Sequence, residues 1–334
     1  MQHNAPHASA AFEGYYSKFD LPSGAHICLV ICKVKNGRIR PNMLTFTYIP
    51  QDVSKTFQHE SFPTEMSMTK LGPDDAFELR IPGTGYVKWN GDSVTEYDLK
   101  CEEFTLTGKT TSRTPWSKST STPESWLVHL PLPLHWHVHT LASACDFTLD
   151  IPGHDVPQLD RQGTAQVHQE KNWAASFPKA HMWVQARDGD RGICLAGGQI
   201  LGLDAFLLGY RGKKYDIDFR PPFATMVAGW SPFMSYTSDW DSKKFSLSVQ
   251  SFRQKVEVEA SAPVGTWFSM PAPFPEGHRP NMVCESFQAR VRVKVYESGW
   301  VGAWRLVEEE VFEGGSLEFG ADFYPAAGSG KKFH

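Results

Sequence analysis

Short runs in which apolar and polar residues alternate make up much of this chain. In FQARVRVKVYE (287–297), Val291, Val293 and Val295 share one face, and the two arginines and the lysine between and before them take the other. A period of two is typical of an antiparallel strand with one face in the core and one in water. Similar runs, rich in β-branched and aromatic residues, predict strands at 26–34, 43–49, 103–111, 182–188, 244–252, 255–260 and 287–297.

Turn residues separate these runs. The chain has 27 Gly and 23 Pro, and GYVKWNGDSVTEYDL (85–99) predicts a hairpin with Asn90-Gly91 as a two-residue turn. Hardly any window has the 3.6-residue apolar period of a helix. Residues 164–182 have room for one short helix, but Trp173 and Pro178 favour an irregular loop. We therefore expect an all-β protein built from barrels or sandwiches.

A polar, turn-rich stretch, DIPGHDVPQLDRQG (150–163), divides the chain into halves of similar size. Each half is long enough for one β-barrel or sandwich with its own core. The pattern predicts an N-terminal domain over 1–150, a linker over 151–163, a C-terminal domain over 164–326 and a flexible tail over 327–334.

Composition narrows the classes of partner and cofactor. The 334 residues carry a net charge of -4 without a Lys/Arg block, so we expect no nucleic-acid partner. No run approaches the ~20 apolar residues of a membrane span, and the N-terminus lacks the pattern of a secretory signal. Six cysteines without a CxxC motif favour reduced thiols and a cytoplasmic protein. The absence of a phosphate-binding loop, a GxGxxG fingerprint and a GxSxG elbow leads us to expect no cofactor. The oligomeric state stays open.

The segment His168–Gln185, HQEKNWAASFPKAHMWVQ, mixes acid, base and amide with two indoles. In one interpretation Glu170 and Lys171 are a solvated ion pair, and the aromatic residues are core. In the other, Glu170 or His168 donates a proton, and Asn172 and Gln185 orient a polar head group. A carboxyl group against Trp faces in a dry pocket has a raised pKa, and indoles stabilise cations. The residues alone leave both interpretations open.

Two further motifs carry candidate chemistry. HWHVH places His135, His137 and His139 on one strand face, as metal ligands or as a polar cavity wall. Along one strand they would span roughly 13 Å, too far for one ion, so we expect no metal. FEGYY (12–16) places Glu13 among aromatic residues, which either anchor a strand or surround an inward-pointing carboxyl group.

Three blocks of sequence stand in a fixed order along most of the chain. They are FEGYYSKFDLPSG (12–24), PLHWHVHTLAS (133–143) and HQEKNW with SFP and MWVQ (168–185), which a Gly-Gly pair follows. Together they resemble tocopherol cyclase and its fungal relatives. More distantly, the layout is similar to fungal Diels–Alderases and carotenoid hydratases, which share a two-domain, lipocalin-related architecture. Three positions depart from the family pattern: Tyr15 and His181 replace Trp, and Ala174 replaces Gly.

The resemblance implies two consecutive lipocalin-like (calycin-type) β-domains and cofactor-free ring closure of a bulky apolar substrate, such as a prenylated, terpenoid or polyketide-derived compound. Tocopherol cyclase protonates an alkene, whereas the Diels–Alderase relatives orient a polyene and polarise a carbonyl. The departures favour a substrate other than tocopherol. A Diels–Alderase-type pericyclase, an alkene hydratase and a non-catalytic carrier of an apolar metabolite are the alternatives.

Mapped onto this chain, the resemblance implies three groups of site residues. Glu170 or Glu13, with His168, would be the acid or polariser. Lys171, Asn172 and Gln185 would hold a polar head group. Further substrate contacts would come from aromatic and imidazole side chains, namely Trp173, Trp183, Trp126, Trp230, Tyr15, Tyr16, His135 and His137.

Overall fold

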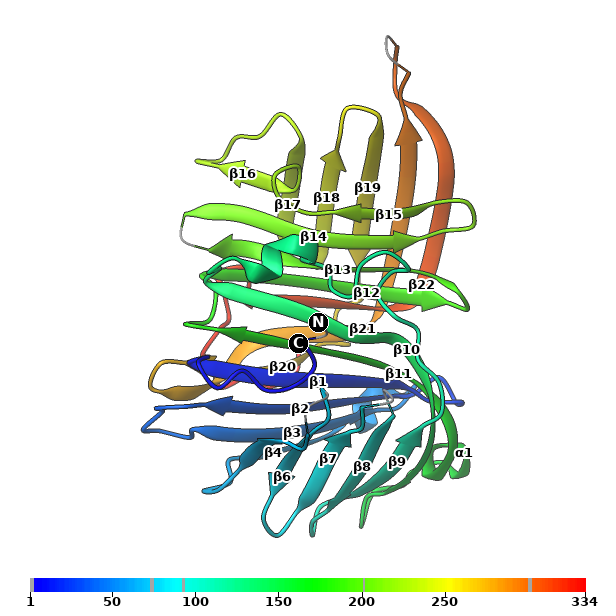
Figure 1. Cartoon of the computed structure of the whole chain (residues 1–334). Helices are drawn as coiled ribbons and strands as arrows, with labels where there is room; N and C mark the ends of the chain where they lie inside the picture. Colours follow the sequence, from blue (N-terminus) through cyan, green and yellow to red (C-terminus); the bar gives the residue numbers. More distant parts are fainter. Residues whose placement is uncertain (1–2, 73–74, 92–93, 201, 300–301) are drawn as a thin grey trace. The chain divides into compact units, whose positions relative to one another are not determined.

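The computed structural model describes residues 3–72, 75–91, 94–200, 202–299 and 302–334. The chain divides into two compact units, each built on a large antiparallel sheet (Figure 1). Unit 1 consists of Met1–Phe177 and Pro273–His278, and unit 2 consists of Pro178–Ala272 and Arg279–His334. The predicted all-β class is confirmed, and the two curled sheets are consistent with lipocalin-like barrel domains.

The sheet of unit 1 has the strand order β4-β3-β2-β1-β11-β10-β9-β8-β7-β6-β5 among the described residues. Strands that follow one another in sequence pair as hairpins from β1 to β4 and from β5 to β11, and β1 pairs with β11. The strands are β1 (Phe12–Asp20), β2 (His26–Val34), β3 (Asn42–Ile49), β4 (Phe57–Ser61), β5 (Ser67–Lys70), β6 (Phe77–Ile81), β7 (Gly85–Trp89), β8 (Thr95–Lys100), β9 (Thr105–Thr110), β10 (Leu134–Asp150) and β11 (Gln162–Ala174). Short helical turns lie at η1 (Val53–Lys55), η2 (Ser125–His129) and α1 (Gln158–Arg161).

Curling of this sheet brings distant strands together over one core. The Tyr97 hydroxyl on β8 donates a hydrogen bond of 3.1 Å to Ser17 Oγ on β1, although three strands pair between them. Phe46 on β3 stacks on Phe104 at 4.0 Å between ring centroids. Side chains that point to this inner face of unit 1 are therefore removed from water.

The sheet of unit 2 follows the order β15-β14-β13-β12-β22-β21-β19-β18-β17, with β16 paired to β14 and β20 to β21. Its strands are β12 (Ala180–Asp188), β13 (Arg191–Ile200), β14 (Leu203–Arg211), β15 (Asp216–Phe219), β16 (Thr225–Val227), β17 (Met234–Asp239), β18 (Lys244–Gln250), β19 (Gln254–Ser261), β20 (Phe268–Phe274), β21 (Gly277–Glu297) and β22 (Arg305–Ala321). The alternation predicted for 287–297 is confirmed: Val291, Val293 and Val295 are fully buried.

The end of the chain packs onto unit 2. The His334 imidazole lies 2.6 Å from the Tyr324 hydroxyl, and the Gly265 and Trp267 N–H groups donate to the His334 carbonyl oxygen. Trp240 packs edge-on against the Tyr324 ring at 4.6 Å. The sequence predicts a flexible tail over residues 327–334. In this structure the tail forms hydrogen bonds with other residues of unit 2.

Three local expectations differ from the structure. The helix or loop expected from residue 164 is wrong up to Ala174, because this stretch is β11 and pairs with both β1 and β10. The stretch 151–163, expected as a linker, lies inside unit 1, where its Pro, Gly and Asp residues turn the chain from β10 into β11. The turn after β7 is longer than two residues, because Trp89 pairs with Thr95 and the Asn90 N–H donates to the Val94 carbonyl; residues 92–93 in it lie outside the described part.

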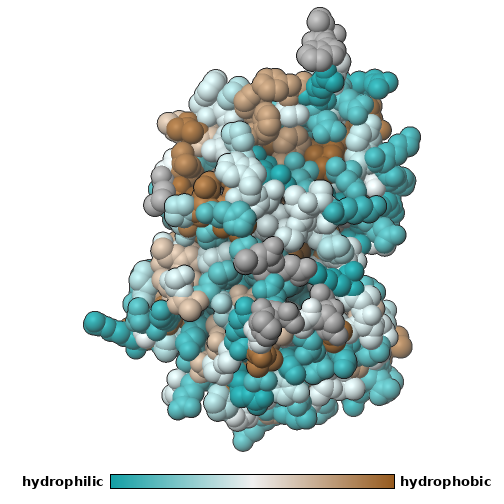
Figure 2. All heavy atoms as spheres, viewed as in Figure 1, coloured by the Kyte–Doolittle hydropathy of each residue, from teal (hydrophilic) through white to brown (hydrophobic). Residues whose placement is uncertain are grey.

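The surface mixes polar and apolar side chains. On the face in Figure 2, apolar residues form patches separated by hydrophilic ones. The most exposed large apolar side chains of the described chain are Phe252, Val264 and Trp230. Among the described residues, no helix has the length and apolar character needed to cross a membrane.

Candidate functional site

Strand pairing places a polar cluster on the inner face of unit 1. In the antiparallel register Glu13 lies opposite Trp173, and Tyr15 lies opposite Lys171. On the other side of β11, His137 lies opposite Lys171. Because residues two apart on a strand point the same way, these side chains share one face. All of them are buried.

The centre of the cluster is an ion pair between Lys171 and Glu13. Lys171 Nζ lies 2.6 Å from Glu13 Oε1, and the exposed fractions of the two side chains are 0% and 6%. The Tyr15 hydroxyl lies 3.3 Å from the same carboxylate oxygen and 3.4 Å from Nζ. A buried pair of opposite charges needs such additional hydrogen bonds to offset its lost hydration.

The charge states of these groups follow from burial and pairing. Burial alone would raise the pKa of Glu13, but hydrogen bonds from His7 and the charge of Lys171 outweigh it and lower the pKa. Burial lowers the pKa of Lys171 to about 8, although Glu13 acts in the opposite direction. Burial and the neighbouring carboxylate raise the pKa of Tyr15. Near neutral pH the site therefore holds a carboxylate, an ammonium group and a neutral phenol.

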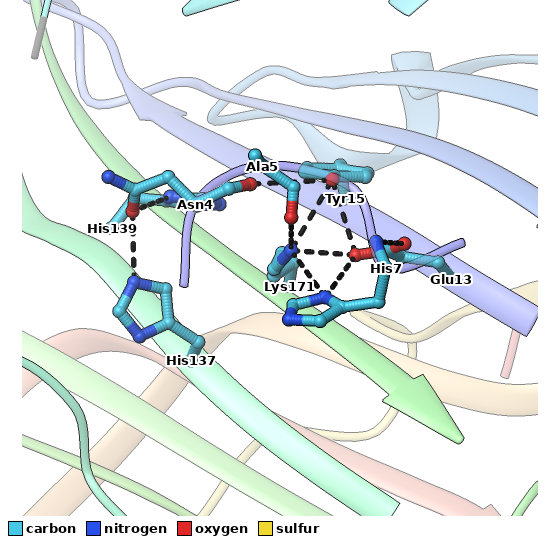
Figure 3. Close-up of polar contacts among 8 residues, drawn as sticks. All are labelled: Asn4, Ala5, His7, Glu13, Tyr15, His137, His139 and Lys171. Carbon is cyan, nitrogen blue, oxygen red and sulfur yellow. Dashed lines mark hydrogen bonds and ion pairs between the residues drawn. The ribbon is translucent and has the colours of Figure 1, made fainter. Parts of the chain in front are cut away.

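Three residues that precede β1, namely Asn4, Ala5 and His7, complete the cluster. Figure 3 shows them together with Glu13, Tyr15, His137, His139 and Lys171. Lys171 Nζ donates to the Ala5 carbonyl oxygen at 2.7 Å, and the His7 N–H donates to Glu13 Oε2 at 2.7 Å. We call residues 3–7 the N-terminal segment.

Aromatic rings cover the ion pair. The Trp173 indole is stacked with His7 at 4.0 Å and with His135 at 4.8 Å between centroids. Lys171 Nζ lies 4.9 Å from the Trp173 ring centroid and 5.1 Å from that of Tyr15. Desolvated cations gain roughly 2 kcal/mol from such ring faces, so this wall favours the charged form of Lys171.

His137 and His139 lie next to this wall and share one partner. His137 Nε2 is 2.9 Å and His139 Nδ1 is 2.6 Å from Asn4 Oδ1. The pKa of each imidazole is well below its ordinary value, first because of burial, and then because of Lys171 for His137 and of His137 for His139. Both rings are therefore neutral at pH 7.

Glu124 is a buried member of the site that sequence reasoning missed. Its carboxylate accepts hydrogen bonds from His135 Nδ1 at 2.7 Å and from the Trp136 N–H at 2.6 Å. It thereby fixes the ring that stacks on Trp173. Only its position in STPESW, close before the histidine-rich strand, could have singled it out.

The strand geometry separates residues that the sequence groups together. His168, Glu170 and Asn172 alternate with Lys171 and Trp173 along β11, so they lie on the opposite face of the sheet. His168 Nε2 lies 2.9 Å from Glu170 Oε2, and both side chains are buried. Tyr16 is on that face as well, because it pairs with Glu170. Glu170 and His168 thus form a pair of their own, apart from Glu13 and Lys171.

The remaining predicted contacts lie elsewhere. Trp183 and Gln185 are buried on β12 of unit 2. Trp126 in η2 is 59% exposed and Trp230 in unit 2 is 71% exposed. Both indoles are largely in contact with solvent in this structure.

Three potential metal ligands of unit 1 lie together, away from the cluster around Lys171. Ligand atoms of His59, Cys101 and Glu103 lie within 4.8 Å of one another, with Glu103 exposed. None of the three belongs to the cluster around Lys171. What that cluster itself offers is a set of hydrogen-bond donors on an aromatic-lined face, which suits a substrate oxygen that gains negative charge.

Comparison with known proteins identifies the fold. No family model and no curated protein matches the chain. A crystal structure of CghA with Sch210972 is 12% identical with a TM-score of 0.55, covering 93% of this chain and 88% of that one. A protein assigned as AttH from Nitrosomonas europaea is 9% identical with a TM-score of 0.53, covering 96% and 95%. Kievitone hydratase from Nectria haematococca is 7% identical with a TM-score of 0.52, covering 96% and 91%.

At these identities the likeness concerns the fold. It agrees with the two-domain architecture expected from the resemblance to fungal Diels–Alderases and carotenoid hydratases, and it does not single out tocopherol cyclase. The chain therefore has the two-sheet fold of the CghA and kievitone hydratase structures.

Proposed function

We propose that this protein is a cofactor-independent cyclase in the cytoplasm, which closes a ring in a bulky apolar substrate by polarising a substrate carbonyl on the inner face of unit 1. The single observation that carries the proposal is the buried Lys171–Glu13 pair, surrounded by aromatic rings. A carrier of an apolar ligand has no need for buried opposite charges, whose desolvation costs several kcal/mol per ion.

The charge states favour carbonyl polarisation over alkene protonation. A carboxyl group with a lowered pKa is ionised at neutral pH, so Glu13 is not a proton donor. Lys171 offers an ammonium group and Tyr15 a neutral hydroxyl. Such fixed donors stabilise charge that develops on an oxygen, and the surrounding wall would hold a folded substrate in reactive geometry. This favours a pericyclic reaction of the Diels–Alder type among the possible ring closures.

Hydration of an alkene is the second candidate function. Its support is the structural likeness to kievitone hydratase, whose name states a hydratase activity. On this chain, the His168–Glu170 pair would be the source of the proton, because it is the buried carboxyl–imidazole pair on the opposite face of β11.

Incubation with a panel of substrates distinguishes these functions. Purified protein is mixed with linear polyene enones, prenylated phenols and polyketide-type precursors, and products are analysed by chromatography and mass spectrometry. A new product of unchanged mass supports cyclisation, and a product heavier by one water molecule supports hydration. Recovery of tightly bound but unchanged compound would identify a carrier.

Variants assign the activity to a face of the sheet. Glu13→Gln and Lys171→Met should abolish most cyclisation, whereas the matched surface variant Lys109→Met should retain it, since Lys109 pairs with Glu96 in solvent. Full turnover by the two buried-site variants would remove the Lys171–Glu13 pair from the chemistry.

A further inference from the structure

Two imidazole nitrogens converge on one oxygen atom at the inner face of unit 1. Asn4 Oδ1 lies 2.9 Å from His137 Nε2 and 2.6 Å from His139 Nδ1 (Figure 3). The two rings meet edge to face, with centroids 5.2 Å apart. An oxygen held by two convergent nitrogens has the geometry of an acceptor between two donors.

In each of the two neutral rings, the hydrogen can be assigned to one of the two nitrogens. Among the described residues, His137 Nδ1 and His139 Nε2 are buried and have no hydrogen-bond partner. A neutral imidazole has one N–H and one lone pair. The Asn4 amide oxygen can only accept hydrogen bonds, so the two nitrogens that face it carry the hydrogens and the partnerless nitrogens carry the lone pairs. Hence His137 donates through Nε2 and His139 through Nδ1.

The acceptor comes from the N-terminal segment and not from a strand of the sheet. The next carbonyl oxygens of this segment take other donors of the cluster: Asn4 O lies 3.4 Å from the Tyr15 hydroxyl, and Ala5 O lies 2.7 Å from Lys171 Nζ. The His7 ring covers the Trp173 face at 4.0 Å. Three oxygens and a flat ring of the chain itself thus occupy the donors and the indole face.

We propose that His137 and His139 form a two-donor site for the carbonyl oxygen of a substrate, and that Asn4 fills this site as an internal competitor when no substrate is bound. The ligand class, a carbonyl compound with a planar or apolar body, rests on the proposed function. The N-terminal segment leaves as the substrate enters, so its oxygens mark the positions of substrate acceptors.

Nitrogen NMR tests the donor assignment without any substitution. Histidine labelled with ¹⁵N should show the Nε2–H tautomer for His137 and the Nδ1–H tautomer for His139. The reverse tautomers would mean that the two rings accept hydrogen bonds, and they would overturn the site.

Binding of a carbonyl probe tests the competition. Acetophenone labelled with ¹³C at the carbonyl is titrated into the full chain and into Asn4→Ala, with Asn36→Ala as matched control, because Asn36 is exposed in unit 1. If Asn4 competes, the probe binds Asn4→Ala about tenfold more tightly than wild type or Asn36→Ala, since a larger fraction of the protein is open to it. Equal affinities in the three proteins would overturn the competition.

The probe also reports on the donors. Its carbonyl resonance should move downfield on binding to Asn4→Ala, and this shift should vanish in Asn4→Ala/His139→Phe and in Asn4→Ala/His137→Phe. A shift that persists in both double variants, with folded protein confirmed by circular dichroism, would contradict the two-donor site. If the probe behaves as expected but no compound of the substrate panel cyclises, the site stands and the proposed cyclisation fails. If substrates cyclise but KM is equal in Asn4→Ala and Asn36→Ala, the proposed cyclisation stands and the competition by Asn4 fails.

Discussion

The Lys171 ammonium lies 2.6 Å from the Glu13 carboxylate across the pairing of β11 with β1, and both side chains are buried. Removing one partner leaves the other charge without compensation, which costs about 3–5 kcal/mol in buried pairs. We expect Glu13→Gln and Lys171→Met each to lower the stability of unit 1 by this amount, and the double variant to lose less than the sum. Native-state hydrogen exchange of β1 and β11 amides measures the change.

The control for this prediction is Lys109→Met, which breaks a pair with Glu96 at the surface and should cost less than about 1 kcal/mol. Equal losses of stability at both pairs would contradict the larger contribution expected of the buried pair.

The titration of Lys171 gives a pH dependence with a definite sign. Its pKa is lowered by burial from 10.5 to about 8, so between these values the unfolded chain binds more protons than the folded one. The free energy of unfolding should therefore rise with pH across this window. Catalysis that uses the ammonium group should instead decline above a pH of about 8. Carbon NMR of labelled lysine measures the titration, and a pKa for Lys171 near 10.5 would contradict the expectation.

The two carboxylates near β11 should affect that titration differently. Glu13 raises the pKa of Lys171 through its charge and its hydrogen bond, so Glu13→Gln should lower the pKa below about 8. Glu170 lies on the opposite face and pairs with His168, so Glu170→Gln should leave the titration unchanged. The same NMR experiment on both variants measures the pKa of Lys171. An equal shift of this pKa in Glu170→Gln would contradict the expectation and show that the two faces are coupled.

Glu124 should stabilise the start of β10. Its carboxylate accepts from both His135 and the Trp136 main chain, and loss of a buried charged acceptor costs about 1–3 kcal/mol. Thermal unfolding of Glu124→Gln should reveal this loss. Glu65→Gln, at an exposed position of the same unit, is the control; similar melting temperatures for the two variants would contradict the role of Glu124.

The tryptophans divide into core and surface residues. Trp116 is 1% exposed, and Trp116→Ala should cost about 3–5 kcal/mol through the cavity it leaves. Trp126→Ala and Trp230→Ala, at exposed positions, should stay within about 0.5 kcal/mol of wild type. Chemical denaturation checks both values. Ligand binding that depends on Trp126 or Trp230 would support the substrate contact predicted for them.

The alternation of side chains made the class of fold predictable, because a period of two is a local signal. Val291 and its neighbours needed no knowledge of distant residues. The same period runs through β11, and would have separated Glu170 from Lys171 had that stretch been recognised as a strand. Trp173 and Pro178 favoured a loop in the sequence, but pairing on both sides of β11 outweighs the preference of single residues.

The partners of the candidate site were not predictable in this way. Glu13 and Lys171 are 158 positions apart, and Asn4 and His137 are 133 apart. Sequence patterns report on neighbours along the chain, whereas these pairs depend on which strands meet in the sheet. The polar character of HWHVH and EKNW indicated where chemistry lies, and the sheet decided which groups share a face.

The position of β1 between β2 and β11 also sets an order of events during synthesis. Its hairpin with β2 joins Asp20 to His26 and can form early, but its other edge pairs Phe12 with Ala174. A chain leaving the ribosome carries that edge unpaired, and Glu13 in water, until β11 has emerged. Contacts of such long range slow folding, and an open strand edge can pair with another chain. The strand that supplies the carboxylate of the candidate site is therefore a place where this protein is exposed to misassembly while it is being made.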